Sequence, residues 1–225
     1  MSLRGGGHSA APFDQLNLGA QVGDDPLRVA ANRRALRDAL QLPAEPLWLQ
    51  QVHGTEVRCA DRPGSLRADA AWSAGAGVVC AVQVADCLPV LLASEDGAVV
   101  GAAHAGWRGL CAGVLEAAVA ALGVPGSRLD AWLGPAISQP HFEVGDEVRA
   151  AFIARDPASA LAFERNAHGR WQCSLALLAR QRLQAVGVQR ITDSGLCTFA
   201  DPQRFYSHRR AAPTGRMAAL IWREA

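Results

Sequence analysis

The feature that most constrains the fold is a pair of apolar runs joined by Asp96-Gly97. The runs cover residues 89–94 and 98–105, and both are rich in valine, leucine and alanine. An Asp-Gly pair between two such runs is a strong signal for a β-hairpin with a two-residue loop. Pairing outward from that loop places His104 opposite Pro89. The sequence therefore predicts an antiparallel hairpin with His104 at its open end.

A cysteine lies near this histidine in the predicted ladder. Cys87 is one diagonal step beyond Pro89 on the same face, and diagonal neighbours lie about 7–8 Å apart between Cα atoms. An imidazole and a thiolate at that separation can bind one shared ion. The alternatives are a Cys87 that packs as a small hydrophobic residue and a His104 that is a hydrogen-bonded core histidine. Asp86 should point to the opposite face and support a neighbouring loop or histidine, without binding the ion itself.

A second histidine is a further candidate ligand. His53 lies within "QQVHGTEV", and Gly54 after it indicates that something approaches the backbone closely. The alternative is an exposed histidine on an edge strand. Nothing in the residue pattern alone brings His53 close to the hairpin.

The rest of the chain alternates irregularly between helical and strand-like segments, which favours a single-domain α/β (α+β) fold with mixed sheets. The domain is expected to span residues 1–225, since no internal repeat or linker interrupts it. Capping residues, apolar spacing and terminal glycines or prolines predict helices at 24–42, 107–124, 143–157 and 174–188. Strands are predicted at 47–60, 77–87, 129–137, 189–195 and 215–224.

Charge and cysteine usage exclude several classes of function. The chain has 22 basic and 21 acidic residues, the basic ones are all arginine, and they are scattered, so we expect no nucleic-acid partner. No apolar run approaches the ~18–20 residues of a membrane span, and the first residues do not form a signal peptide. The six cysteines include no Cys-X-X-Cys pair. We therefore expect a reduced cytoplasmic protein that does not bind membranes, and a monomer.

Taken together, several segments resemble one family across almost the whole chain. This is the laccase-domain family, also called multicopper polyphenol oxidase or peptidoglycan-editing-factor proteins, several of whose members have purine nucleoside phosphorylase activity. The matching strings are "GGHSAAPFDQLNLG" (6–19), "VGDDPLRVAANR" (22–33), "QVHGTEV" (51–57), "ADCLPVLL" (85–92), "HAGWRGL" (104–110), "LGPAIS" (133–138), "FEVGDEV" (142–148), "CTFADPQRFYSHRR" (197–210) and "TGR" (214–216).

The resemblance implies an αββα layered fold with a mononuclear metal site of two histidines and a cysteine. Matched by motif, the metal ligands are His53, Cys87 and His104, and the implied nucleoside-binding residues are Asn17, Arg33 and Glu143. The implied catalytic residues are Cys87, His104 and Glu143. Two departures stand out: the segment before "RGGGHS" is short, and Phe142 stands where a tyrosine is common.

By resemblance, the expected function is a zinc-dependent purine nucleoside enzyme that carries out phosphorolysis and also deaminates adenosine. Three protein ligands leave one position open on tetrahedral zinc, which is the catalytic pattern. Arg33 could bind phosphate as a fork-shaped donor, and Glu143 could hold or protonate the purine. Both could instead be ordinary helix residues, and Asn17 an ordinary turn residue.

Three alternatives use the same residues. Two histidines and a cysteine also describe a type 1 copper site, so a copper-dependent polyphenol oxidase is one alternative. A trinuclear copper cluster is excluded within one chain, because the six histidines include no His-X-His pair. The second alternative is a cysteine hydrolase or peptidoglycan-precursor editing enzyme with Cys87 as nucleophile and His104 as base. The third is a metal-binding protein without catalytic activity.

Overall fold

The hairpin predicted from Asp96-Gly97 forms the centre of the larger sheet. The computed structural model describes residues 1–224, and in it strands β5 (Leu88–Ser94) and β6 (Val100–Ala105) pair antiparallel with Pro89 opposite His104. This confirms the predicted register. The sheet has six strands in the order β11-β7-β5-β6-β3-β2, and parallel and antiparallel pairs are mixed. The hairpin is flanked by β7 (Leu129–Leu133) and β3 (Ala70–Ser73), and the edge strands are β11 (Arg190–Asp193) and β2 (Val57–Cys59).

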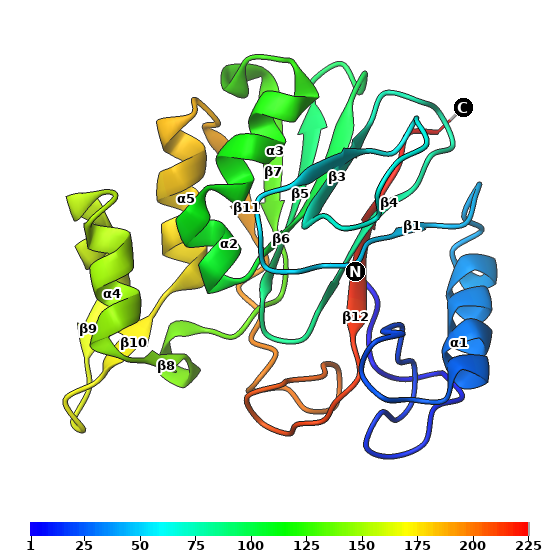
Figure 1. Ribbon diagram of the computed structural model, residues 1–225, viewed down its shortest axis with the longest axis horizontal. Helices are drawn as coiled ribbons and strands as arrows, with labels where there is room; N and C mark the ends of the chain where they lie inside the picture. Colours follow the sequence, from blue (N-terminus) through cyan, green and yellow to red (C-terminus); the bar gives the residue numbers. More distant parts are fainter. Residues whose placement is uncertain (225) are drawn as a thin grey trace.

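A second, three-stranded sheet packs face to face on the first (Figure 1). Its strands are β1 (Leu47–Trp48), β4 (Cys80–Val84) and β12 (Met217–Ile221), in the order β1-β4-β12. Strand residues alternate between faces, so Cys80, Val82 and Ala219 point inward together and meet Ala71 and Ala102 of the larger sheet. The layer between the sheets is therefore closed by small and medium apolar side chains.

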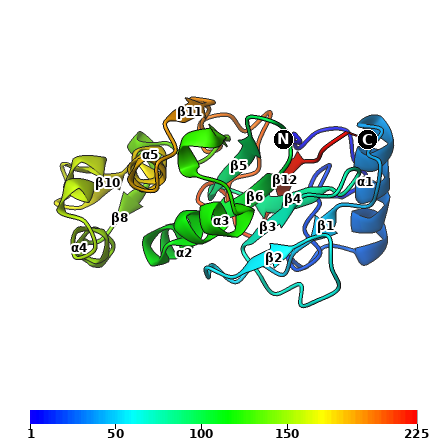
Figure 2. The ribbon, with the colours of Figure 1, turned by 90° about the horizontal axis from the view of Figure 1, so that it is seen from above.

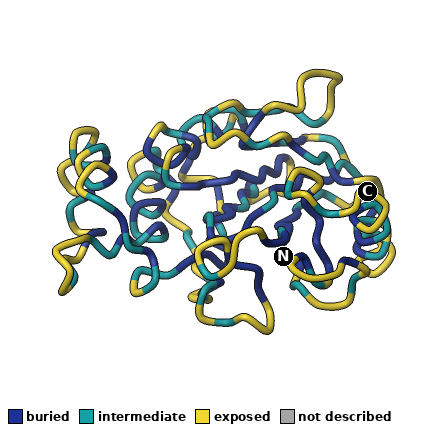
Figure 3. Tube along the Cα trace, turned by 60° about the horizontal axis from the view of Figure 1, so that its bottom comes forward, coloured by how far each residue is buried: buried dark blue, intermediate teal, exposed yellow. Residues whose placement is uncertain are grey.

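Helices cover the two outer faces and complete four layers. Helix α1 (Pro26–Ala39) packs Leu36 against Ala81 and Leu220 on the outside of the smaller sheet. Helices α3 (Val114–Leu122) and α5 (Leu175–Ala185) cover the outside of the larger sheet, as Figure 2 shows from above. The single-domain α/β fold with mixed sheets and the αββα layering are confirmed. In Figure 3 buried chain runs through the middle of the molecule, and exposed residues lie mainly on its loops.

A small third unit lies beyond the larger sheet. Strands β8 (Glu143–Val144), β10 (Trp171–Cys173) and β9 (Phe163–Arg165) form a separate antiparallel sheet next to helix α4 (Asp146–Ile153). The 143–157 segment was predicted as one helix, but its first two residues belong to β8. Three short 3-10 helices lie at Gly126–Arg128, Gln139–His141 and Pro157–Ala162.

Two further predicted elements are interrupted. The helix predicted at 107–124 is split into α2 (Trp107–Ala112) and α3, because Gly113 between them has a left-handed backbone with φ of 108°. The strand predicted at 47–60 is divided into β1 and β2, and the chain between them forms a loop that contains His53. Over residues 1–224, every helix falls short of the length and hydropathy that crossing a bilayer requires.

Candidate functional site

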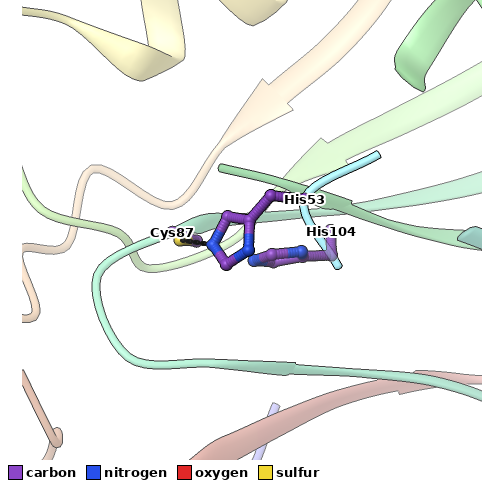
Figure 4. A group of neighbouring side chains, drawn as sticks. All are labelled: His53, Cys87 and His104. Atoms are coloured by element: carbon purple, nitrogen blue, oxygen red, sulfur yellow. Dashed lines mark hydrogen bonds between the residues drawn. The ribbon is translucent and has the colours of Figure 1, made fainter. Parts of the chain in front are cut away.

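The three predicted metal ligands converge at one end of the β-sandwich. The ligand atoms of His53, Cys87 and His104 all lie within 4.8 Å of one another. Cys87 Sγ is 3.8 Å from His53 Nε2, and the two imidazole rings meet edge to face with centroids 4.7 Å apart (Figure 4). The structure thus brings His53 to the hairpin, which the residue pattern could not predict.

Local backbone geometry aims each of the three side chains. His104 shares a face of β6 with Ala102, so it points into the layer between the sheets, near its end. Cys87 follows directly on Asp86, whose φ of 84° turns the chain sharply between β4 and β5. His53 itself has a φ of 60°, a conformation uncommon outside glycine. The site therefore combines one strand residue with two residues at tight turns.

A buried carboxylate positions both histidines. Asp69 is fully buried, and it accepts hydrogen bonds from the backbone N–H groups of Val52, His53 and Gly54. His104 Nδ1 donates to the same carboxylate at 2.8 Å, which leaves Nε2 facing the site. This is the carboxylate–histidine arrangement that orients metal ligands in proteins. Asp69 was not among the predicted site residues, although an aspartate within the apolar run 68–72 was a usable signal.

The thiol and the buried imidazole stabilise each other's charged forms. Burial opposes ionisation of Cys87, but the neighbouring His104 and His53 outweigh it and lower the pKa of the thiol to about 6. Burial likewise opposes protonation of His104, yet the Cys87 and Asp69 charges raise its pKa to about 9. Without a metal, the pair is a thiolate and an imidazolium at neutral pH. A metal would take the place of the imidazolium proton.

Glycines in "AGWRG" let the start of helix α2 lie directly against this group. A Cβ added at Gly106 would lie 2.8 Å from His53 Cδ2 and 3.0 Å from Cys87 Sγ. A Cβ at Gly109 would lie 2.9 Å from the carbonyl oxygen of Gly54. Any side chain at these two positions would therefore push on the ligands or on the loop that carries His53.

Asp86 supports loops, as predicted, and is not part of the ligand group. Its carboxylate accepts hydrogen bonds from Thr198 Oγ1 at 2.7 Å, Ser207 Oγ at 3.0 Å and the backbone N–H of Arg209 at 2.7 Å. The alternation of strand faces does not apply at Asp86, because its φ of 84° places it in the turn after β4. Its role is to join the 198–209 segment to the turn that carries Cys87.

The ligand group opens into a pocket of about 710 Å³. The pocket lies at the end of the sandwich, and its walls come from the 19–22 loop, helix α1, β1, the end of β4 and the C-terminal segment. Besides the three ligands, its polar and aromatic lining includes Arg33, Trp48, Gln51, Gln83, Arg108, His208 and Arg216.

The predicted nucleoside-binding residues occupy three different settings. Arg33 lines the pocket, but its Nε and Nη2 both donate to the carbonyl of Leu18, and its guanidinium stacks 4.2 Å over the ring of Trp48. Asn17 is fully buried below the pocket, where its amide binds Gly19 and Asp24 and accepts from the backbone of Arg216.

Glu143 lies outside the lining of this pocket. Its carboxylate accepts a hydrogen bond from Asn166 at 2.8 Å and faces Arg170 at 3.6 Å. Its backbone is linked to the site through Arg209, whose Nη1 donates to the Glu143 carbonyl. Any action of Glu143 at the ligand group therefore requires a substrate that extends towards β8.

The residues present fit a metal ion. Zinc bonds of about 2.0–2.3 Å in a tetrahedron put a sulfur and a nitrogen ligand roughly 3.5 Å apart, close to the 3.8 Å between Cys87 Sγ and His53 Nε2. A thiolate and two imidazoles, one held by a carboxylate, are ligands that zinc and copper both accept. The group could therefore hold a metal ion, and its donor atoms do not specify which.

A layered α/β domain with a His–Cys–His group at the floor of a pocket defines a class of protein with a candidate mononuclear metal site. Comparison with known proteins assigns the family. Residues 1–224 match the sequence model of the family described as multi-copper polyphenol oxidoreductase laccase, and the chain belongs to that family.

Curated relatives and solved structures agree with this assignment. The chain is 54% identical to a purine nucleoside phosphorylase of Pseudomonas aeruginosa, over 99% of this chain and 91% of the relative. It is 50% identical to the purine nucleoside phosphorylase YfiH of Escherichia coli, over 98% and 91%. A crystal structure of a Neisseria meningitidis protein superposes with a TM-score of 0.95 at 43% identity, over 99% of this chain and 92% of the other.

Proposed function

We propose that this protein cleaves purine nucleosides by phosphorolysis and also deaminates adenosine, in the pocket that ends at His53, Cys87 and His104. The observation that carries the proposal is the opening of this three-ligand group into a pocket of about 710 Å³, a volume within the range of small-molecule sites. The names of the relatives from P. aeruginosa and E. coli support the reaction class.

Zinc is the metal that we propose for the site, held by His53, Cys87 and His104. When bound, it would supply a Lewis acid with one open position facing the pocket. Asp69 keeps His104 in the tautomer that presents Nε2, and it fixes the backbone on both sides of His53. These hydrogen bonds preorganise the two proposed histidine ligands in the absence of a metal ion.

The pocket walls would hold the nucleoside. Arg33 and Trp48 stack on one another, and the Nη1 of Arg33 has no acceptor within residues 1–224, so it can bind a polar group of the substrate. Asn17 acts indirectly by fixing the 17–19 turn that leads into the pocket-lining loop. Glu143 is the residue that we propose to contact the purine. Glu143→Gln should then lower both phosphorolysis and deamination, because both reactions need the base held in place.

The test is a metal analysis combined with turnover of adenosine and inosine, with and without phosphate. We expect about one zinc per chain, release of free base and ribose 1-phosphate only with phosphate, and inosine from adenosine in either condition. Cys87→Ser should lose metal and activity, whereas Cys59→Ser, a half-buried thiol outside the ligand group, should keep both.

Other outcomes favour the alternatives. Stoichiometric copper together with oxidation of phenols would favour the polyphenol oxidase. Hydrolysis by metal-free protein that depends on Cys87 would favour the cysteine hydrolase, and peptidoglycan precursors would be its first substrates to test. A bound metal with no turnover of any of these substrates would favour a non-catalytic metal-binding protein.

A further inference from the structure

The pocket contains an excess of positive charge that the ligand group does not explain. Three arginines line it, Arg33, Arg108 and Arg216, and within residues 1–224 no aspartate or glutamate does. Of the two nearby carboxylates, Asp69 is bound to His104 and the His53 loop, and Asp86 is bound to the 198–209 segment. Apart from the Cys87 thiolate, which faces the His104 imidazolium, the described pocket residues therefore offer these arginines no anionic partner.

Arg216 presents one edge of its guanidinium to this space. Its Nη1 donates to the carbonyls of Thr214 at 2.8 Å and Gly215 at 3.0 Å. Its aliphatic part packs on Gly19, where an added Cβ would lie 2.7 Å away. Nε and Nη2 have no acceptor in the described chain, so the edge that suits a bidentate oxyanion is free. Burial lowers the pKa of Arg216, and the charge of Cys87 opposes this, which indicates a partly desolvated cation near the ligand group.

Arg108 is the second arginine with free N–H donors in the described part of the chain. It is held only by stacking over the ring of Trp107 at 4.5 Å, and within residues 1–224 it makes neither a hydrogen bond nor an ion pair through its side chain. Arg33 differs from both, because two of its nitrogens are already bound to Leu18. The strings "AGWRG" and "TGR" thus each contribute one arginine that has free N–H donors and no ion-pair partner within residues 1–224.

We infer that Arg108 and Arg216 form an oxyanion subsite in this pocket, built to take a phosphate group beside the His53–Cys87–His104 group. Planar guanidinium groups bind phosphate in a bidentate manner, and two of them neutralise most of its charge. The subsite rests on the proposed function in one respect, since phosphorolysis would make inorganic phosphate its natural ligand. A phosphate ester carried by the substrate has the same chemistry and could occupy it instead.

The test measures phosphate binding directly as well as through turnover. Inorganic phosphate is titrated calorimetrically into the purified protein, and KM for phosphate is measured with inosine. Arg108→Ala and Arg216→Gln should each weaken phosphate binding about 10- to 100-fold, the effect of losing one charge-assisted contact. KM for inosine should not change. Arg34→Ala, an exposed arginine outside the pocket, is the control and should match the wild type.

Arg108→Ala should fold like the wild type, because the Arg108 side chain makes no hydrogen bond within residues 1–224. A loss of phosphate binding in this variant therefore cannot be attributed to misfolding. Equal phosphate affinity in wild type, Arg108→Ala and Arg216→Gln would overturn the subsite. Phosphate that binds only to the metal would give this result. Arginine-dependent phosphate binding without nucleoside cleavage would support the subsite and refute the phosphorylase. Adenosine 5′-monophosphate that binds more tightly than adenosine, with the gain lost in Arg108→Ala, would support the subsite and identify an esterified phosphate as its ligand.

Discussion

At the scale of single residues, Asp69 explains why two histidines distant in sequence act together. One carboxylate accepts three backbone N–H groups around His53 and the Nδ1 proton of His104. Removing a carboxylate that holds a metal-binding histidine in place commonly weakens metal binding 10- to 100-fold. Asp69 is therefore as much a part of the site as the ligands themselves.

The reactivity of Cys87 should reveal its charged neighbours. In chelator-treated protein, alkylation of Cys87 by iodoacetamide should rise through a midpoint near pH 6 and level off above it, because the thiolate is the reactive form and its pKa is about 6. Because the pKa of Cys87 is depressed, the alkylation rate stays high down to about pH 6. Lowering the pH further protonates the thiolate and stops the reaction. His104→Ala should move the midpoint upward by removing the neighbouring cation. Peptide mass spectrometry over pH 4–10 measures both profiles.

Cys173 provides an internal control for this experiment. Burial raises the pKa of its thiol to about 12, so it should stay unmodified across the range. A Cys87 midpoint near that of an ordinary thiol, about 8.5, would contradict the thiolate–imidazolium pair.

At the scale of elements, the site depends on how closely helix α2 approaches the His53 loop. Gly106→Ala should lower zinc affinity at least tenfold, because the new methyl group would contact both His53 and Cys87. The backbone itself tolerates alanine there, since the φ of Gly106 is −65°. Competition with a chromogenic chelator gives the affinity, and circular dichroism checks the fold.

Gly54→Ala is the matched control from the opposite side of the contact. Its added Cβ would meet only ordinary neighbours, Val52 Cγ2 at 3.5 Å and Asp69 Oδ2 at 3.6 Å. We expect near-normal zinc binding for this variant. Equal affinities in Gly106→Ala and Gly54→Ala would show that the close approach has no role at the site.

The elements also show which parts of the structure sequence could predict. The β5–β6 register followed from Asp96-Gly97, because turn chemistry and strand period fix the pairing locally. The break at Gly113 was missed, because helical periodicity continues on both sides of it. The approach of His53 depends on contacts with Asp69 that no local pattern encodes, so only family resemblance could place it among the ligands.

The proposed substrate-binding residues were only partly predictable. Resemblance named Asn17, Arg33 and Glu143, but their settings depend on tertiary hydrogen bonds such as those from Arg33 to Leu18. That Arg108 and Arg216 have no carboxylate partner among residues 1–224 is likewise a property of the folded chain. Scattered arginines in a sequence give no sign of which will find partners.

At the scale of the whole molecule, the N-terminal and C-terminal segments hold each other in place. Tyr206 is fully buried and donates a hydrogen bond to the carbonyl of Phe13 at 2.7 Å, with Arg4 stacked 4.9 Å from its ring. Tyr206→Phe should lower the free energy of unfolding by about 1–3 kcal/mol, because the buried Phe13 carbonyl loses its donor. Urea unfolding should show a lower midpoint with an unchanged m-value. A midpoint equal to that of the wild type would mean that water satisfies the carbonyl.

Strand β12 is synthesised long after β4, the strand with which it pairs. It pairs with β4 along its length, its Ala218 binds Ser2, and Arg216 immediately precedes it. A ribosome makes the chain from the N-terminus, so β4 leaves it before β12 has been made. Until then, the edge of β4 that pairs with β12 has no partner strand. During that interval the inner sheet layer is open and the pocket lacks one of its arginines. Synthesis of this strand therefore completes both the layer between the sheets and the wall of the pocket, and a nascent chain stalled before it lacks that part of each.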